Sequence, residues 1–313
     1  MEKDNIKQNS MKAWALATRP KTLTAAAVPV MVATAIAWQE HALFVSSGCI
    51  QGVKGFNILA MILCFLFAFI MQIDANFVND YYDCVRGNDD ETRLGPKRAC
   101  AQGWISLKAM RIAMVVTTLL GCAVGLPLAV IGGWEMVLVG VACVVFCFLY
   151  TTCLSYWGMG DLLVLVFFGI VPVCCTYYVE KGVAPGKSVW MASFAVGMVI
   201  DTLLIINNYR DIENDRKAGK RTLAVFIGKK AMAQVYLWIV PISLCLMAFV
   251  FAELSRNIAI IIPFILFFFN LHYFTWKKMV MIGEGKELNK VLGMTARNIF
   301  LFGILSSLGV IFA

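Results

Sequence analysis

The chain has 313 residues, of which 60% are hydrophobic and 15% are charged. Soluble domains carry about a quarter charged residues, so this composition, with a mean hydropathy of +0.78, leaves no room for a separate soluble domain. The net charge of +8 comes from bases that flank apolar runs. These bases therefore indicate a membrane protein, and we expect no nucleic-acid partner.

About nine apolar stretches are long enough to cross a lipid bilayer, which takes about 20 residues each. Backbone groups inside lipid must be hydrogen-bonded within their own segment, so we expect helices rather than the short alternating strands of a barrel. Residues 1–313 are thus predicted to form one all-α integral membrane domain. The expected spans are residues 22–39, 56–80, 109–131, 134–153, 160–179, 188–208, 233–252, 257–276 and 297–313.

The distribution of basic residues predicts which side of the membrane each loop occupies. Residues 1–21 are polar and basic, without the pattern of a cleavable signal peptide, so we expect the first span to be a permanent anchor. With nine spans, all lysines and arginines lie on the side of the N-terminus except Lys54, Lys181, Lys187 and Arg256. The positive-inside rule then places the N-terminus in the cytoplasm, and we expect a bacterial inner-membrane protein.

A carboxylate-rich cluster stands at the end of the second apolar stretch. Its sequence is Asn76-Phe77-Val78-Asn79-Asp80-Tyr81-Tyr82-Asp83. On a helix that turns by about 100° per residue, its two asparagines and two aspartates fall within about 100° of arc and share one face. Gln72 joins that face, whereas Asp74 falls on the opposite side.

The sixth apolar stretch ends in a second cluster, Asn207-Asn208-Tyr209-Arg210-Asp211-Ile212-Glu213-Asn214-Asp215. The same helical geometry gives one face to Asp201, Asn207, Asn208, Asp211 and Asp215. Each cluster leads into a basic loop, predicted at residues 84–108 and 209–232, and both loops fall on the predicted cytoplasmic side. We therefore expect the two polar faces to turn toward one cavity.

Carboxylate and amide oxygens without histidine or cysteine favour magnesium or manganese over zinc. Magnesium is commonly held by one or two carboxylates together with the phosphates of a substrate, and nearby bases can donate to those phosphates. The pattern predicts a membrane enzyme that uses Mg²⁺ to bind a diphosphate. A divalent-cation or proton-coupled transporter is the alternative from another class, although its acids would be expected near the membrane midplane.

The two clusters resemble the aspartate-rich motifs of the UbiA superfamily of intramembrane prenyltransferases. The resemblance covers nearly the whole chain and implies nine transmembrane helices around a central cavity, with a magnesium-bound prenyl diphosphate. Within the superfamily, the chain is similar to the branch that prenylates 1,4-dihydroxy-2-naphthoate in menaquinone biosynthesis. Further matching segments are Arg19-Pro20-Lys21-Thr22-Leu23, Arg93-Leu94-Gly95-Pro96, Gly160-Asp161 and Gly219-Lys220-Arg221-Thr222-Leu223-Ala224-Val225.

This resemblance implies a role for each polar residue of the two clusters. The metal ligands, of which the aspartates are also the catalytic residues, would be Asn76, Asp80, Asp83, Asp211 and Asp215. The contacts to the polyprenyl diphosphate would come from Arg19, Lys21, Asn79, Arg93, Asn208, Arg210, Lys220 and Arg221. The product would be demethylmenaquinone, formed with loss of CO₂ and diphosphate.

Two features leave the site open at this stage. Asp201 lies about 15 Å deeper than Asp211 along the helix, where it could orient a ring hydroxyl or act as a catalytic base, or else simply bond to a neighbouring helix. Members of the family often carry a base in the loop after the fourth helix, but residues 150–161 contain none.

Another aromatic acceptor, such as 4-hydroxybenzoate, homogentisate or haem, is the alternative within the superfamily.

Overall fold

The computed structural model describes residues 6–46, 56–87, 93–254, 259 and 261–312, and these residues contain no β-strand. Lys54, Arg256 and the start of the predicted span 257–276 lie outside the described residues. The prediction of an all-α architecture is confirmed. The helices are α1 (Met11–Ala17), α2 (Pro20–Ser46), α3 (Ile58–Val85), α4 (Leu107–Gly132), α5 (Glu135–Leu149), α6 (Gly160–Val164), α7 (Val171–Lys181), α8 (Lys187–Lys217), α9 (Leu223–Ile227), α10 (Lys229–Leu254), α11 (Ile261–Ile282) and α12 (Leu288–Phe312).

Eight helical segments in the described residues are long and apolar enough to cross a membrane. One of them joins α5 to the π-helical turn η1 (Tyr150–Leu154), and another joins α6 and α7 through the π-helical turn η2 (Leu165–Ile170). The remaining predicted span, residues 257–276, corresponds to α11, which has 22 residues but carries Asn270, His272 and two lysines. The prediction of nine spans therefore holds approximately.

The helix ends extend further than hydropathy alone predicts. Helix α8 continues to Lys217, so the predicted loop 209–232 contains the last turns of α8, all of α9 and the start of α10. Two bases in the last turn of α8 complement the negative end of the helix dipole. The aspartates of the second cluster are consequently held on a rigid helix rather than in a loop.

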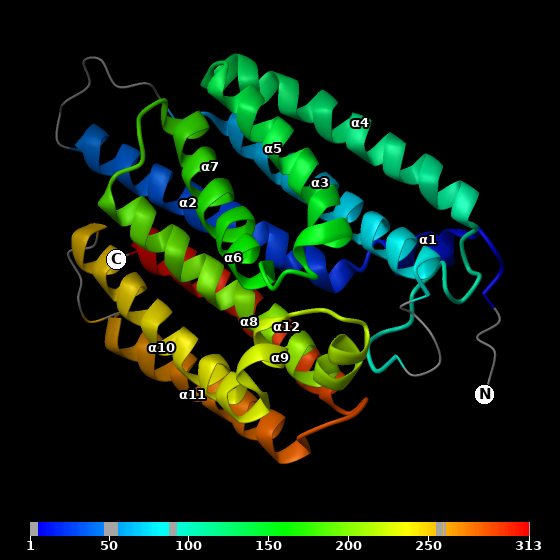
Figure 1. The fold of residues 1–313 in the computed structure, drawn as a ribbon. Helices are drawn as coiled ribbons and strands as arrows, with labels where there is room; N and C mark the ends of the chain where they lie inside the picture. The colour runs from blue at the N-terminus through cyan, green and yellow to red at the C-terminus, as the bar shows by residue number, and fades with distance from the viewer. Residues whose placement is uncertain (1–5, 47–55, 88–92, 255–258, 260, 313) are drawn as a thin grey trace.

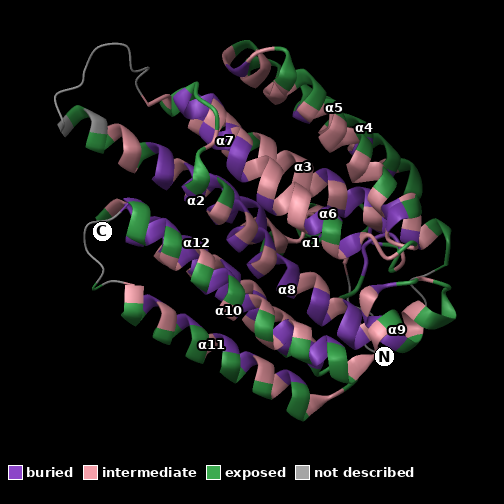
Figure 2. Ribbon diagram, turned by 60° about the vertical axis from the view of Figure 1, so that its left-hand side comes forward, coloured by how far each residue is buried: buried purple, intermediate pink, exposed green. Residues whose placement is uncertain are grey.

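Helix α8 lies at the centre of the bundle and packs against α2, α10, α12 and η2. Of the candidate spans, the one formed by α8 has the largest buried share, 67%, and the one formed by α5 and η1 the smallest, 11% (Figure 2). Gly169 of η2 allows this packing, because a Cβ at that position would lie 2.5 Å from the carbonyl oxygen of Ser193. Small residues permit such close backbone contact between membrane helices.

The C-terminal ends of α3 and α8, which carry the two clusters, lie at the same end of the bundle as α1 (Figure 1). The C-terminal end of α12 lies at the opposite end. Asp74 points away from the clusters, as its position on the helix predicts. Its carboxylate accepts hydrogen bonds from the hydroxyls of Thr117, at 2.5 Å, and Thr118, at 2.8 Å, and so joins α3 to α4.

Candidate functional site

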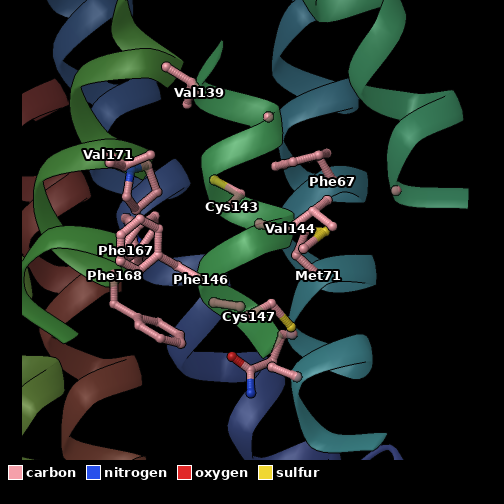
Figure 3. Close-up of a pocket in the computed structure, with 18 of the residues that line it drawn as sticks. Phe67, Met71, Val139, Cys143, Val144, Phe146, Cys147, Phe167, Phe168 and Val171 are labelled. Atoms are coloured by element: carbon pink, nitrogen blue, oxygen red, sulfur yellow. The ribbon is translucent and has the colours of Figure 1, made fainter. Parts of the chain in front are cut away.

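A cavity of about 650 Å³ runs between α2, α3, α4, α5, η2, α7 and α8. Its wall is mostly apolar, with Phe67 and Met71 of α3 on one side and Phe167 and Phe168 of η2 on the other (Figure 3). One end of the wall is polar. The polar side chains there, half of them on α3, belong to Thr22, Gln72, Asn76, Asn79, Tyr150 and Asn207.

Both aspartates of the α3 cluster are buried and hold a segment of the first basic loop. The carboxylate of Asp80 accepts hydrogen bonds from the backbone N–H groups of Ala99, at 3.0 Å, and Cys100, at 3.1 Å. One turn later, Asp83 accepts from the Arg98 guanidinium at 3.1 Å. Residues 98–100 are thereby fixed against the last turns of α3.

The asparagines of α3 connect the cluster to two other helices. The Asn76 amide donates at 2.9 Å both to the Thr18 carbonyl and to the Thr22 hydroxyl, at the junction of α1 and α2. Asn79 accepts from the Thr151 hydroxyl of η1 at 3.1 Å. These bonds position the α3 face at the polar end of the cavity.

The α8 cluster is organised by a buried arginine. The Arg210 guanidinium makes two parallel hydrogen bonds to the Asp211 carboxylate, at 2.8 and 2.6 Å, and its side chain is only 2% exposed. The Asn207 side chain lines the cavity and donates to the Leu203 carbonyl at 2.9 Å, and Asn208 is buried beside it. Bidentate pairing of this kind fixes the plane of the carboxylate.

The two clusters meet, as their helical faces predict. The carboxylates of Asp83 on α3 and Asp215 on α8 lie close enough for their charges to repel each other. Lys220 lies close enough to Asp215 to attract it, and Arg19 and Arg93 do the same for Asp80. Carboxylates and bases from distant parts of the chain therefore interact with one another, and Asp83 and Asp215 lie near Tyr150 at the polar end of the cavity.

The loop after α5 contains no basic residue, but basic side chains from other segments lie beside it. The Arg86 guanidinium donates to the carbonyls of Thr151, at 3.0 Å, and Thr152, at 2.9 Å. Arg86 and the Lys220 ammonium lie 5.2 and 5.4 Å from the ring centroid of Tyr156 in this loop. Other segments thus supply the charge that the loop lacks. The backbone N–H of Arg221 donates to the Tyr156 carbonyl at 3.0 Å, although its side chain, like that of Lys21, is exposed.

Asp201 lies deeper, on the buried side of α8. It lies close to Asp161 at the start of α6, and both aspartates lie near Tyr150, which lines the cavity. Within the described part of the chain, the Oδ1 atoms of both aspartates are buried and have no hydrogen-bond partner. Buried acceptors without a donor are uncommon in folded proteins, so this pair is suited to receive a hydrogen bond from a bound molecule.

The donor set fits a hard divalent cation that shares its coordination with a ligand. No three His, Cys, Asp or Glu side chains in the described residues gather closely enough to hold a metal by themselves. Magnesium, however, usually keeps several waters and takes one or two carboxylates plus phosphate oxygens. The like charges of Asp83 and Asp215 repel each other, and a bound cation would offset that repulsion.

Sequence reasoning assigned no specific role to several residues that shape the site. Arg86 follows Asp83 by three residues, close to one helical turn, and that spacing could have drawn attention to it. The pairing of Arg98 with Asp83 has no signal in the sequence, because the adjacent Lys97 fits the same pattern. Asn289, which bonds to Arg210 at 2.8 Å, lies too far along the chain for any local pattern to connect the two.

Comparisons with known proteins agree with this architecture. The chain is 32% identical to a 1,4-dihydroxy-2-naphthoate octaprenyltransferase of Haemophilus influenzae over 80% of this chain and 81% of that protein. It is 33% identical to the Escherichia coli protein of the same name, over 70% of this chain and 69% of that protein. A solved structure of a UbiA homolog from Archaeoglobus fulgidus bound to GPP and Mg²⁺ has the same fold, with a TM-score of 0.63 and 18% identity, over 96% of this chain and all of that one.

The family assignment follows from a match that spans most of the bundle. The model of the UbiA prenyltransferase family matches residues 27–280, from the first third of α2 to the end of α11. That range contains both carboxylate clusters and most of the residues that line the cavity. The chain therefore belongs to the UbiA prenyltransferase family.

Proposed function

We propose that this protein transfers a polyprenyl group from polyprenyl diphosphate to 1,4-dihydroxy-2-naphthoate, with loss of diphosphate and CO₂, to give demethylmenaquinol, the hydroquinone form of demethylmenaquinone. The observation that carries the proposal is the convergence of two carboxylate clusters at the polar end of an apolar cavity of about 650 Å³. A ligand with an anionic head and a long apolar tail complements both parts. The names of the Haemophilus influenzae and Escherichia coli relatives support the naphthoate acceptor.

The proposed cofactor is Mg²⁺, in keeping with the Mg²⁺ of the Archaeoglobus fulgidus homolog. Asp83 and Asp215 would hold it from opposite helices, with Asp211 and Asn76 beside them. Asp80 would use the lone pairs that the amides of residues 99 and 100 leave free, since a carboxylate has about four acceptor sites. When bound, Mg²⁺ neutralises the charge that develops on the departing diphosphate.

The bases around the clusters would bind the phosphate oxygens. Arg19 and Arg93 lie on the α3 side, near Asp80, and Lys220 lies on the α8 side, near Asp215. Guanidinium groups suit phosphates because their planar N–H groups can donate in pairs. The remaining proposed contacts, which include exposed bases and cluster amides, are Lys21, Asn79, Asn208, Arg210 and Arg221.

In the proposed reaction, the bond between the prenyl carbon and the diphosphate oxygen breaks, and the prenyl carbon bonds to the ring carbon that bears the carboxylate. That carboxylate leaves as CO₂. The apolar wall excludes water from the allylic cation, and aromatic faces such as Phe146 and Phe167, with ring centroids 5.0 Å apart, can stabilise positive charge. Asp201 would orient a ring hydroxyl or accept its proton, and near-normal turnover of an Asp201→Asn variant would remove that role.

The proposed location is the bacterial inner membrane, with the N-terminus and both clusters in the cytoplasm. The side on which most lysines and arginines gather supports this orientation. Digestion of an N-terminal tag by added protease in inverted vesicles, but not in right-side-out vesicles, is the expected result. The reverse pattern would overturn the orientation.

Product formation by purified protein in lipid nanodiscs tests the function directly. We expect prenylated, decarboxylated product from 1,4-dihydroxy-2-naphthoate and a polyprenyl diphosphate, with activity lost in EDTA and restored by Mg²⁺. A panel containing 4-hydroxybenzoate and homogentisate tests the acceptor, and a preference for either would replace the naphthoate assignment. Divalent-cation flux into protein-containing liposomes without prenyl diphosphate would instead favour the transporter alternative.

A further inference from the structure

Asn289 connects the two halves of the site, although it belongs to neither cluster. It is the second residue of α12 and follows the turn that leaves α11. Its side-chain oxygen accepts a hydrogen bond from Nη1 of Arg210 at 2.8 Å, and its amide nitrogen donates to the Leu94 carbonyl at 2.8 Å. A single side chain therefore bonds both to the α8 cluster and to the segment that contains Arg93.

The bond to Arg210 completes the contacts of a buried cation. Nε and Nη2 of Arg210 donate to the two oxygens of Asp211, and Nη1 donates to Asn289. With three nitrogens engaged and the side chain 2% exposed, the guanidinium has one fixed orientation. Because Arg210 in turn fixes the plane of the Asp211 carboxylate, Asn289 acts on that carboxylate through Arg210.

The bond to the Leu94 carbonyl holds the segment that contains Arg93 in place. The next residue, Gly95, packs directly on two guanidinium groups, since a Cβ there would lie 2.9 Å from Nη2 of Arg210 and 3.2 Å from Nη2 of Arg93. Arg93 also donates through Nε to the Pro96 carbonyl at 3.0 Å, which shapes the same turn. The separation between the two arginines thus depends on the position of residues 94–96, and Asn289 anchors that position.

We propose that Asn289 is a positioning residue that fixes Arg210 and the 94–96 segment relative to each other, and so sets Asp211 and Arg93 for binding of the metal–diphosphate. The inference rests on the proposed function for the identity of the ligand. An amide is suited to this task because it offers one acceptor to the cation and one donor to the carbonyl. An aspartate would keep the acceptor, lose the donor and compete with Asp211 for Arg210.

The test measures binding as well as turnover. Full-length Asn289→Leu protein, whose new side chain has a similar size, is compared with wild type for equilibrium binding of an unreactive prenyl thiodiphosphate in the presence of Mg²⁺. Loss of hydrogen bonds to a charged group costs about 1.5–3 kcal/mol, so we expect Kd to rise about 10-fold or more. In turnover assays, KM for the prenyl diphosphate should rise similarly, whereas KM for the aromatic acceptor should stay within about twofold, because the hydrogen-bond partners of Asn289, Arg210 and Leu94, do not line the cavity.

Asn270→Leu is the matched control, because Asn270 is exposed on α11 and its amide donates only to the Leu266 carbonyl one turn away. The added methyl group of Gly95→Ala would lie 2.9 Å from Nη2 of Arg210, so this variant should also raise Kd. It tests the link between residues 94–96 and Arg210 if Asn289→Leu folds poorly. Wild-type affinity in both site variants would overturn the inference. Absence of prenyl transfer by a wild-type protein that still binds the thiodiphosphate would contradict the proposed function alone.

Discussion

Asp83 and Asp215 come from the C-terminal ends of two different helices, and their carboxylates lie close enough to repel each other. Arg98 bonds to Asp83 and Lys220 lies near Asp215, so each carboxylate is partly compensated from its own side. A cation bound between the two carboxylates would offset their repulsion.

The Asp215→Asn variant should distinguish the repulsion between the Asp83 and Asp215 carboxylates from their proposed role in binding the metal. In EDTA, we expect the variant to be at least as thermally stable as wild type, because the Asp215 carboxylate loses hydration on burial and is repelled by Asp211 and Asp83, against the attraction of Lys220 and Arg210. The stabilisation that Mg²⁺ and prenyl diphosphate give to wild type should be lost, and turnover should fall by about 100-fold or more, in keeping with removal of charge stabilisation in an active site.

Glu213→Gln is the control for the Asp215 variant. Glu213 lies on the same helix and its side chain is 69% exposed, in a surface pair with Arg216. Surface pairs contribute about 0–1 kcal/mol, so this variant should match wild type in both assays. An Asp215→Asn protein that is markedly less stable than wild type in EDTA would contradict the repulsion between the two carboxylates.

Asp80→Ala should weaken the structure as well as the activity. Both oxygens of Asp80 accept backbone N–H groups in a buried setting, and each donor left unsatisfied costs about 1–3 kcal/mol. We expect a lower unfolding temperature and faster proteolysis near residues 98–100, measured by limited digestion and mass spectrometry. Unchanged stability with activity lost would instead make Asp80 a metal ligand without a structural role.

Gly169→Leu should disturb the centre of the bundle. A side chain at Gly169 would begin 2.5 Å from the Ser193 carbonyl and 2.8 Å from the Cα of Gly197, and helix backbones cannot yield as flexible side chains do. Overpacking of this kind costs about 1–3 kcal/mol, so the thermal midpoint of unfolding should fall. Gly186→Ala is the control, since a Cβ there meets nothing within 4 Å. Equal midpoints for the two variants would contradict the close approach of η2 and α8.

The sequence predicts the helices and the two polar faces well, because both depend on local periodicity. Asp74 and Asp80 differ by six residues, and helical geometry alone assigns them to opposite sides, as the bond from Thr117 to Asp74 bears out. Hydropathy misplaces the end of α8, because the helix continues to Lys217 after its residues turn polar. Helical hydrogen bonds do not require apolar side chains once the chain has left lipid.

The partners of the cluster residues could not be predicted, because they come from segments distant in sequence. Asp80 is held by the amides of residues 99 and 100, and Arg210 by the amide of Asn289. A backbone donor leaves no mark on the sequence, and an isolated asparagine has no pattern. The charge near Tyr156 likewise comes from Arg86 and Lys220, on segments that only the fold brings together.

Gly140→Phe should change the length of prenyl chain that the protein accepts. Gly140 of α5 lines the cavity, and a Cβ there would meet nothing within 4 Å, so a phenyl ring would enter the open space rather than clash with a helix. Less volume then remains for the tail, while the polar end at Asn79 and Asn207 is untouched. Because each methylene in an apolar pocket is worth about 1–3 kcal/mol, kcat/KM for a long polyprenyl diphosphate should fall at least about 10-fold more than for geranyl diphosphate.

Leu138→Phe, at a position on α5 that is 57% exposed and outside the cavity wall, should leave that ratio unchanged. An equal loss for both chain lengths in Gly140→Phe would mean that the tail does not occupy this part of the cavity.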